Sequence, residues 1–415
     1  MKNTKITALA AAMLMLTAAT GCGINPGGFS GIGKAELLTP NQVSADTLTS
    51  TCPDENFMQA QTAFALSLMQ HASETRAGKN LLLSPYSLMQ ALAMTANGAA
   101  GETRSEMEQV LGGIPLEQLN SGLYNERMNA RTKALTTANS IWYRDENGFV
   151  PKQDFLQTAA GYYGAEAYKA PFDDSTLAAV NNWCKEKTDG MIPEITDRIR
   201  TETAMILLNA VCFDAKWVEP FENPGTGTFQ AASGAVQDVT MLRSTETAYL
   251  QDLHASGFIK PYESGYSFAA ILPETGMTPE EYLAQQTPEG LRGMLTGAKN
   301  TDVEIALPAF SLADKMQLNG TLSEMGMQKA FDDADFSAMA DGIDDLAIGE
   351  VLQKTYIDVN ASGTKAAAAT EVEVDSCAPP APEYSVILNR PFVYMILDSD
   401  TMLPVFTGIL NSAQS

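Results

Sequence analysis

The sequence predicts a fold of mixed α and β structure, because hydrophobic side chains recur in it at both helical and strand spacing. Residues 57–71 carry Phe57, Phe64 and Leu68 at helical intervals, which predicts an amphipathic helix. Residues 371–375 alternate strictly between acidic and valine side chains, which is the period of a strand with one buried and one solvated face. The chain has 415 residues, of which 45% are hydrophobic, so it can bury a large core.

Other elements follow in order along the chain. Residues 80–87 indicate the end of a strand and the start of a helix, with Ser84 and Ser87 at the junction. Residues 139–143, which include Trp142, indicate a buried strand. Residues 351–359 indicate a further strand, and an unusual segment follows it directly.

This segment, residues 363–382, has the composition of an exposed loop and the pattern of a strand. Its even-numbered positions carry small or apolar side chains: Thr364, Ala366, Ala368, Thr370, Val372 and Val374. A glycine opens it and prolines close it, which suits a loop because proline cannot donate to a sheet ladder. Small side chains on the even face would let the segment enter a sheet that is already packed. The alternative, a helical alanine run before a surface strand, leaves the register of the later residues unexplained.

This pattern resembles the hinge and reactive-centre loop of the serpins, and further serpin-like motifs occur in the family order. They lie at residues 80–87, 139–143, 180–192, 207–229, 304–310, 331–336, 351–359 and 390–408. The resemblance covers about residues 53–412, whereas length alone would suggest two or three domains. It implies one large α+β domain of the serpin fold. That fold has a large central, mostly antiparallel sheet, flanking helices, two smaller sheets and an exposed reactive-centre loop at about residues 361–382.

The resemblance also assigns roles to residues. Ser84, Ser87 and Asn209 match the shutter, the group beneath the place where the central strands part, and Trp217 matches the tryptophan of the breach, at the top of the sheet. Gln353 stands where the family usually has a shutter histidine. Because an amide can also bridge by hydrogen bonds, we expect the shutter to be kept and its pH sensitivity to be lost.

The hinge is the first part of the loop, over which insertion into the sheet begins. It corresponds to Ala361, Ser362, Gly363, Thr364, Lys365, Ala366, Ala367, Ala368, Ala369 and Thr370. Ala361 and Ser362 replace an acidic pair that is usual in the family. Both residues are small, so they do not obstruct insertion.

The resemblance implies suicide inhibition of serine proteases. The target's serine would attack the loop, form an acyl-enzyme, and be trapped when the loop enters the sheet. Counted from the hinge as in the family, the reactive bond joins Cys377 to Ala378, and the next bond precedes Pro379 and should be a poor substrate. The small side chains favour elastase-like targets, with papain-like cysteine proteases second. The alternative is a non-inhibitory serpin, which bulky or charged even-face hinge residues would favour; the hinge has none.

The N-terminus predicts export. Lys2 and Lys5, an apolar run over residues 6–16 and small residues before Cys22 are typical of a secretory signal peptide. They also resemble the lipobox of a bacterial lipoprotein, with Cys22 as the lipidated residue; an ordinary signal peptide is the alternative. Residues 1–22 would then be the signal, 23–51 a flexible tether, and 52–415 a serpin domain on the extracellular side of a bacterial membrane, lipid-anchored or secreted.

Composition excludes several other functions. The net charge of −24, or −26 without Lys2 and Lys5, disfavours nucleic acid and offers no basic patch to heparin-type polysaccharides. The cysteines left after lipidation, Cys52, Cys184, Cys212 and Cys377, form no disulfide framework or zinc motif, and Cys184 and Cys212 lie in apolar segments that predict burial. The two histidines, His71 and His254, lie outside any catalytic pattern. We therefore expect a monomer with no enzymatic activity, metal or cofactor.

Overall fold

The computed structural model describes residues 34–39, 54–129, 134–145, 150–199, 203–341, 346–364 and 382–414. Several predicted features lie outside these residues: the signal peptide with Cys22, most of the tether, the hinge residues 365–370, and the reactive bond between Cys377 and Ala378. The first four hinge positions, residues 361–364, are described.

The described residues form nine α-helices. They are α1 (Glu55–Thr75), α2 (Pro85–Ala96), α3 (Gly101–Val110), α4 (Leu116–Asn129), α5 (Gln153–Tyr163), α6 (Asp174–Lys187), α7 (Pro279–Ala284), α8 (Pro288–Thr296) and α9 (Asn319–Glu324). The helix predicted at residues 57–71 is α1, and the Asp54 side chain caps it by accepting a hydrogen bond from the Phe57 N–H at 2.8 Å. The Ser84 hydroxyl caps α2, where Pro85 occupies the first turn.

A large mixed sheet positions the site. Its path runs through β1 (Glu36–Leu37), β5 (Glu166–Ala170), β3 (Leu135–Arg144), β6 (Met205–Phe213), β15 (Glu350–Asn360), β16 (Gly363–Thr364) and β7 (Ala215–Lys216), with β13 (Phe310–Gln317) paired to β15. All nine residues of β6 are buried, as expected of a central strand covered on both faces. β6 and β15 are direct parallel neighbours from Ile206 opposite Glu350 to Cys212 opposite Tyr356.

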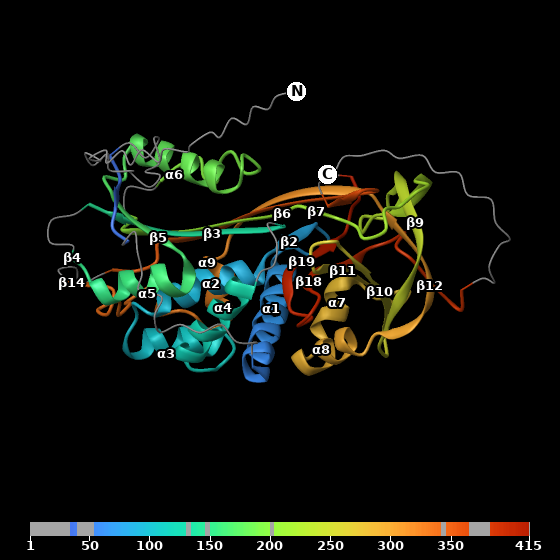
Figure 1. Ribbon diagram of the computed structural model, residues 1–415, viewed down its shortest axis with the longest axis horizontal. Coiled ribbons are helices and arrows are strands. Elements are labelled where there is room, and N and C mark those ends of the chain that lie inside the picture. Colours follow the sequence, from blue (N-terminus) through green and yellow to red (C-terminus); the bar gives the residue numbers. More distant parts are fainter. Residues whose placement is uncertain are drawn as a thin grey trace, which may run out of the picture. The chain divides into compact units, whose positions relative to one another are not determined.

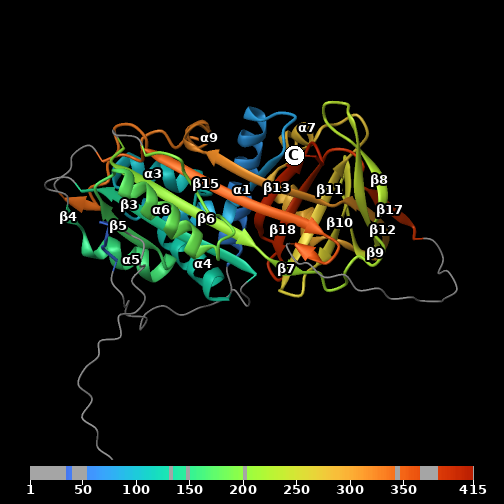
Figure 2. The same ribbon diagram turned by 90° about the horizontal axis from the view of Figure 1, so that it is seen from above.

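Helices cover both faces of this sheet. Figure 1 shows α6 on one side of β3, β5 and β6, and α2, α4 and α5 on the other; Figure 2 shows α6 over the long strands. The two faces of β6 differ accordingly, because Asn209 bonds to α2 whereas its neighbours Leu208 and Ala210 point to the opposite face. Cys184 of α6 and Cys212 of β6 are both buried, which confirms their predicted burial.

The edge strand β1 comes from the segment predicted as a tether. Glu36 and Leu37 pair antiparallel with Lys169 and Tyr168 of β5, and the Leu38 N–H donates to the Ala167 carbonyl at 2.7 Å. Residues 36 and 37 of the predicted flexible segment 23–51 therefore belong to the sheet. A two-residue strand carries no periodicity of its own, so no pattern in the sequence indicates it.

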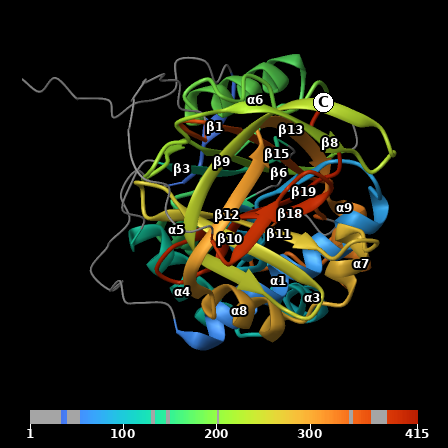
Figure 3. The same cartoon turned by 90° about the vertical axis from the view of Figure 1, so that its right-hand side faces the viewer.

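The second sheet has nine strands and faces the viewer in Figure 3. They are β17 (Tyr384–Ile387), β12 (Lys299–Pro308), β9 (Val236–Gln251), β10 (Ala255–Pro261), β11 (Tyr266–Pro273), β18 (Phe392–Asp398), β19 (Pro404–Leu410), β2 (Leu81–Leu83) and β8 (Gly225–Gln230). The 16-residue β9 pairs with β8, β12 and β10. It thereby joins these strands into one sheet. A third sheet pairs β4 (Val150–Pro151) with β14 (Ala340–Asp341).

These layers confirm the predicted α+β class. In the described part of the chain, no helix is both long and apolar enough to cross a membrane.

Candidate functional site

A buried polar network lies under the junction of β6 and β15. Gln353 of β15 exchanges two hydrogen bonds with the Ser84 backbone: the Ser84 N–H donates to Oε1 at 2.9 Å, and Nε2 donates to the Ser84 carbonyl at 3.0 Å. The same Nε2 donates to Asn209 Oδ1 of β6 at 3.0 Å. The amide therefore joins the two central strands to the start of α2, which is the bridging geometry that the sequence predicts for Gln353.

Asn209 extends the network on the β6 side. Its Nδ2 donates to the Ser87 carbonyl at 2.9 Å, to the Ser87 hydroxyl, and to Asn139 Oδ1 of β3 at 2.7 Å. Ser84, Ser87, Asn209 and Gln353 are each at most 2% exposed. Since a buried polar group is costly without a partner, parting β6 from β15 requires these bonds to be replaced.

The structure adds members that the sequence analysis missed. Asn139 Nδ2 donates to Gln90 Oε1 of α2 at 3.0 Å, and the Ser84 hydroxyl donates to the Val405 carbonyl at 2.7 Å. The available signal for Asn139 was a polar residue, followed by Ser140, at the start of the predicted buried strand of residues 139–143.

Trp217 holds the start of the hinge. It is fully buried, its indole N–H donates to the Asn360 carbonyl at 2.9 Å, and its backbone N–H donates to the Ser362 carbonyl at 3.2 Å. The Phe221 N–H donates to the Ala361 carbonyl at 2.9 Å. The chain is thus fixed by its backbone at Ala361 and Ser362, where the side chains do not matter to these bonds.

The next two hinge residues already lie in the sheet. Gly363 and Thr364 form β16, which pairs antiparallel with Asn360 and Val359 of β15 on one side and with β7 on the other. A Cβ atom at Gly363 would lie 2.2 Å from the Ala215 carbonyl oxygen, so only glycine fits there.

The side chain of Thr364 is buried and hydrogen-bonded. It is 0% exposed, and its hydroxyl is hydrogen-bonded to the hydroxyl of Tyr262 at 2.7 Å. Tyr262 in turn stacks on Trp217 with ring centroids 4.1 Å apart. Burial raises the pKa of Tyr262, so its hydroxyl remains protonated. Sequence reasoning missed Tyr262, because it lies 102 positions from its partner and belongs to no motif.

These residues hold backbone segments of the sheet and of the hinge in place. Among the described residues, no group of three or more His, Cys, Asp or Glu side chains is arranged to hold a metal ion. The arrangement keeps β6 and β15 together. It also holds the start of an additional strand, β16, between β15 and β7.

Comparison with known proteins identifies the family. Residues 59–413 match the family model for serpins, described as serine protease inhibitors. The chain belongs to the serpin family. It is 30% identical to leukocyte elastase inhibitor A of Rattus norvegicus over 379 residues, which cover 85% of this chain and 98% of the relative.

Solved structures of serpins support the assignment to this family. A thermophilic serpin, tengpin, in the native state is 40% identical to this chain, with a TM-score of 0.86 and coverage of 91% of this chain and 100% of tengpin. In the latent state it gives a TM-score of 0.77 at 39% identity, with coverage of 88% and 100%. Serpins in general bind and inhibit target proteases and are not themselves catalytic enzymes.

Proposed function

We propose that this serpin is a monomeric suicide inhibitor of serine endopeptidases with elastase-like specificity. The observation that carries the proposal is the position of β16. Its two residues stand between β15 and β7, at the end of the seam where β6 and β15 are still direct neighbours. Gly363 and Thr364 of the hinge therefore already form a strand. The position that later hinge residues would occupy is closed, because β6 and β15 pair directly there.

The register of β16 says where further hinge residues would go. Thr364 stands opposite Val359, so a continued antiparallel strand would place Ala366 opposite Ile357 and Ala368 opposite Thr355. Val359, Ile357 and Thr355 are buried, whereas the intervening Asp358 and Tyr356 are only half-buried. Directly opposed residues share a face of the sheet, so the even hinge positions would face the core. From Thr364 to Thr370, the hinge has only threonine and alanine on this face.

Inhibition then follows from two coupled events. The target's serine attacks the carbonyl carbon of Cys377, the bond to Ala378 breaks, and the peptide that begins at Ala378 leaves with a free amino group. The freed loop enters the seam and carries the acylated protease with it. About a dozen new strand residues, at roughly 0.5–1.5 kcal/mol net per hydrogen bond, supply on the order of 10 kcal/mol. That is comparable to the stability of a protein domain.

Elastase-like specificity rests on the small residues Cys377 and Ala378. Similarity to a leukocyte elastase inhibitor over nearly its full length supports it. A papain-like cysteine protease is the second class of target, because the same small residues would fit it. We further propose that the mature protein is held by lipid at Cys22 on the extracellular side of a bacterial membrane, on the strength of its lipobox-like N-terminus.

The decisive experiment mixes the mature protein with an elastase. We expect an adduct that survives SDS and a released C-terminal peptide whose first residue is Ala378, identified by mass spectrometry. Cleavage of the loop without an adduct, leaving the elastase active, would contradict inhibition and favour a non-inhibitory serpin. A peptide that begins elsewhere, for instance at Ser376, would show that the reactive bond is misplaced.

A further inference from the structure

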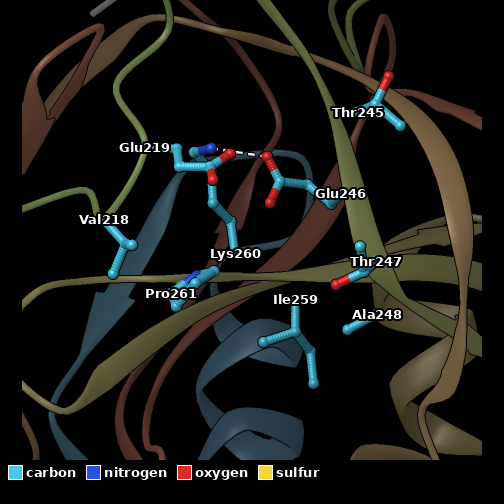
Figure 4. A pocket seen from close by; sticks show the side chains of 9 residues that line it. All are labelled: Val218, Glu219, Thr245, Glu246, Thr247, Ala248, Ile259, Lys260 and Pro261. Carbon is cyan, nitrogen blue, oxygen red and sulfur yellow. Dashed lines mark hydrogen bonds and ion pairs between the residues drawn. The ribbon is translucent and has the colours of Figure 1, made fainter.

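A cavity of about 300 Å³ lies beside the segment that holds the hinge. Figure 4 shows it between β9, β10 and the turn that follows β7. Its lining consists of Val218, Glu219, Thr245, Glu246, Thr247, Ala248, Ile259, Lys260 and Pro261. None of these residues belongs to the shutter or to the hinge, so loop insertion does not explain the cavity.

The cavity contains a buried ion pair. The side chains of Lys260 and Glu246 are 1% and 8% exposed, and Lys260 Nζ lies 2.6 Å from Glu246 Oε1. The Ser244 hydroxyl donates to the same oxygen at 2.6 Å. Lys260 Nζ also lies 4.5 Å from the centre of the Phe221 ring, so a π face offsets part of its desolvation.

One carboxylate oxygen of this pair remains available. Glu246 Oε2 accepts no hydrogen bond from any residue in the described ranges, and Figure 4 shows it turned toward the cavity. A carboxylate has acceptor sites on both oxygens, and a charged donor can replace the solvent at the open one. The free oxygen is therefore a site for a hydrogen-bond donor that enters the cavity.

The charges around the cavity favour a cationic donor. Its lining carries Glu219 and Glu246 against Lys260, a net charge of −1. An adjoining cavity of about 860 Å³ shares Glu219 and Lys260 and adds two carboxylates, Glu222 and Glu304, against Arg243. A monocation would neutralise the lining of the first cavity, whereas a carboxylate ligand would add to its negative charge.

We propose that this cavity binds a small amphipathic primary amine. Its ammonium group donates to Glu246 Oε2 and to the Glu219 carboxylate, and its apolar body packs against Val218, Ala248 and Ile259. An ammonium supplies three donors, and bonds between charged partners are the strong kind. The volume suits a ligand at the small end of the usual range. Binding requires neither a protease nor an intact reactive loop, so it is independent of the proposed function.

The test is a titration of the mature protein with phenethylamine, followed by saturation-transfer NMR. Phenylacetate and 2-phenylethanol, which have the same apolar body with an anionic or neutral head, are the controls. We expect saturable binding of the amine in the millimolar range and much weaker binding of both controls. Equal binding of phenylacetate, or no binding of the amine, would overturn the proposal.

Variants locate the site. Glu219→Gln, on an exposed side chain, should weaken amine binding by roughly tenfold, the fold-change that corresponds to one lost charge-assisted hydrogen bond. The paired change Glu246→Gln with Lys260→Gln removes both buried charges together and should abolish the preference for the amine over 2-phenylethanol. Glu324→Gln, on an exposed carboxylate of α9, is the matched control and should change nothing. Unaltered binding by Glu219→Gln would contradict the site even if the paired variant failed to fold.

Discussion

A single hydroxyl group is the polar partner of the first buried side chain in the described part of the hinge, that of Thr364. Thr364 reaches the sheet through the backbone pairing of β16, but its side chain has one polar partner among the described residues, the hydroxyl of Tyr262 at 2.7 Å. Trp217 fixes Tyr262 by stacking and fixes Asn360 and Ser362 by hydrogen bonds. The hinge is therefore anchored by one connected group of residues.

Removing either hydroxyl should release this anchor. Thr364→Val and Tyr262→Phe each leave a buried hydroxyl without its partner, at a cost of about 1–3 kcal/mol. The double variant should cost little more than either single one, because both changes remove the same bond. The urea midpoint of the first unfolding transition measures these effects. Thr364→Ser keeps the hydroxyl and is the control; strictly additive losses would show that the two groups are not coupled.

Gln353 makes a pH prediction possible. In Gln353→His, a neutral imidazole can accept from the Ser84 N–H and donate to Asn209, but the protonated ring can only donate. Burial disfavours the charged ring, so its pKa in the folded protein would lie below the ordinary value of about 6.5. The stability of the variant relative to wild type should thus be retained above about pH 6.5 and fall as the pH drops below that value, because the unfolded chain then binds the proton more readily. Melting curves of both proteins from pH 8 to 5 decide the matter, and parallel curves would refute it.

The reactive position sets the class of target. Cys377→Arg should move inhibition from elastase-like toward trypsin-like proteases, because the side chain before the cleaved bond enters the specificity pocket. Second-order rate constants with one protease of each class measure the change. Unchanged preference would mean that another bond serves as bait.

Functional residues were predictable from the sequence where they lie in a motif. They were not predictable where the fold brings together residues that are far apart in the chain. Ser84, Ser87, Asn209 and Gln353 lie in motifs, and the chemistry of an amide was enough to expect that Gln353 bridges the strands. Tyr262, by contrast, meets Thr364 only because two distant segments adjoin. No local pattern records such a contact.

At the scale of elements, periodicity located helices and strands well, but their ends depend on side-chain detail. The helix predicted at residues 57–71 extends over Glu55–Thr75, with its start fixed by the Asp54 cap. The short strand β1 was not predictable, because two residues carry no period and become a strand only beside an existing sheet edge. β16 lies in the segment 363–382, whose strand pattern was recognised, but no pattern indicates that its first two residues are already paired. β16 is nevertheless the element that defines the register of insertion.

That register predicts opposite results for neighbouring substitutions. Ala366→Glu or Ala368→Arg would place a charge opposite buried Ile357 or Thr355, at a cost of several kcal/mol. Slower insertion lets the acyl-enzyme hydrolyse, so these variants should be cleaved at the same bond while the protease stays active. Ala367→Glu would stand opposite half-buried Tyr356 and should be much milder. The stoichiometry of inhibition compares them; equal effects on both faces would show that the register is wrong.

At the scale of the whole molecule, the large sheet described here begins an additional strand but leaves no space for it between β6 and β15. β6 and β15 are neighbours, two hinge residues are already in place beyond them, and the chain resembles native tengpin more closely than the latent form. Because β6 and β15 pair directly, the position for an additional strand between them is closed in the described sheet. The protein should therefore be kinetically trapped in a fold that is less stable than the inserted one.

Cleavage of the loop tests this directly. A protease that cuts between residues 371 and 378 without being inhibited frees the loop to enter the seam, and the new hydrogen bonds and buried even face should raise the melting temperature substantially. Calorimetry before and after nicking measures the rise. The Ala368→Arg variant is the matched control, because it is cut at the same place but bears a charge on the face that must be buried, so its rise should be small. If wild type melts at the same temperature before and after cleavage, the loop stores no free energy and the seam between β6 and β15 does not open.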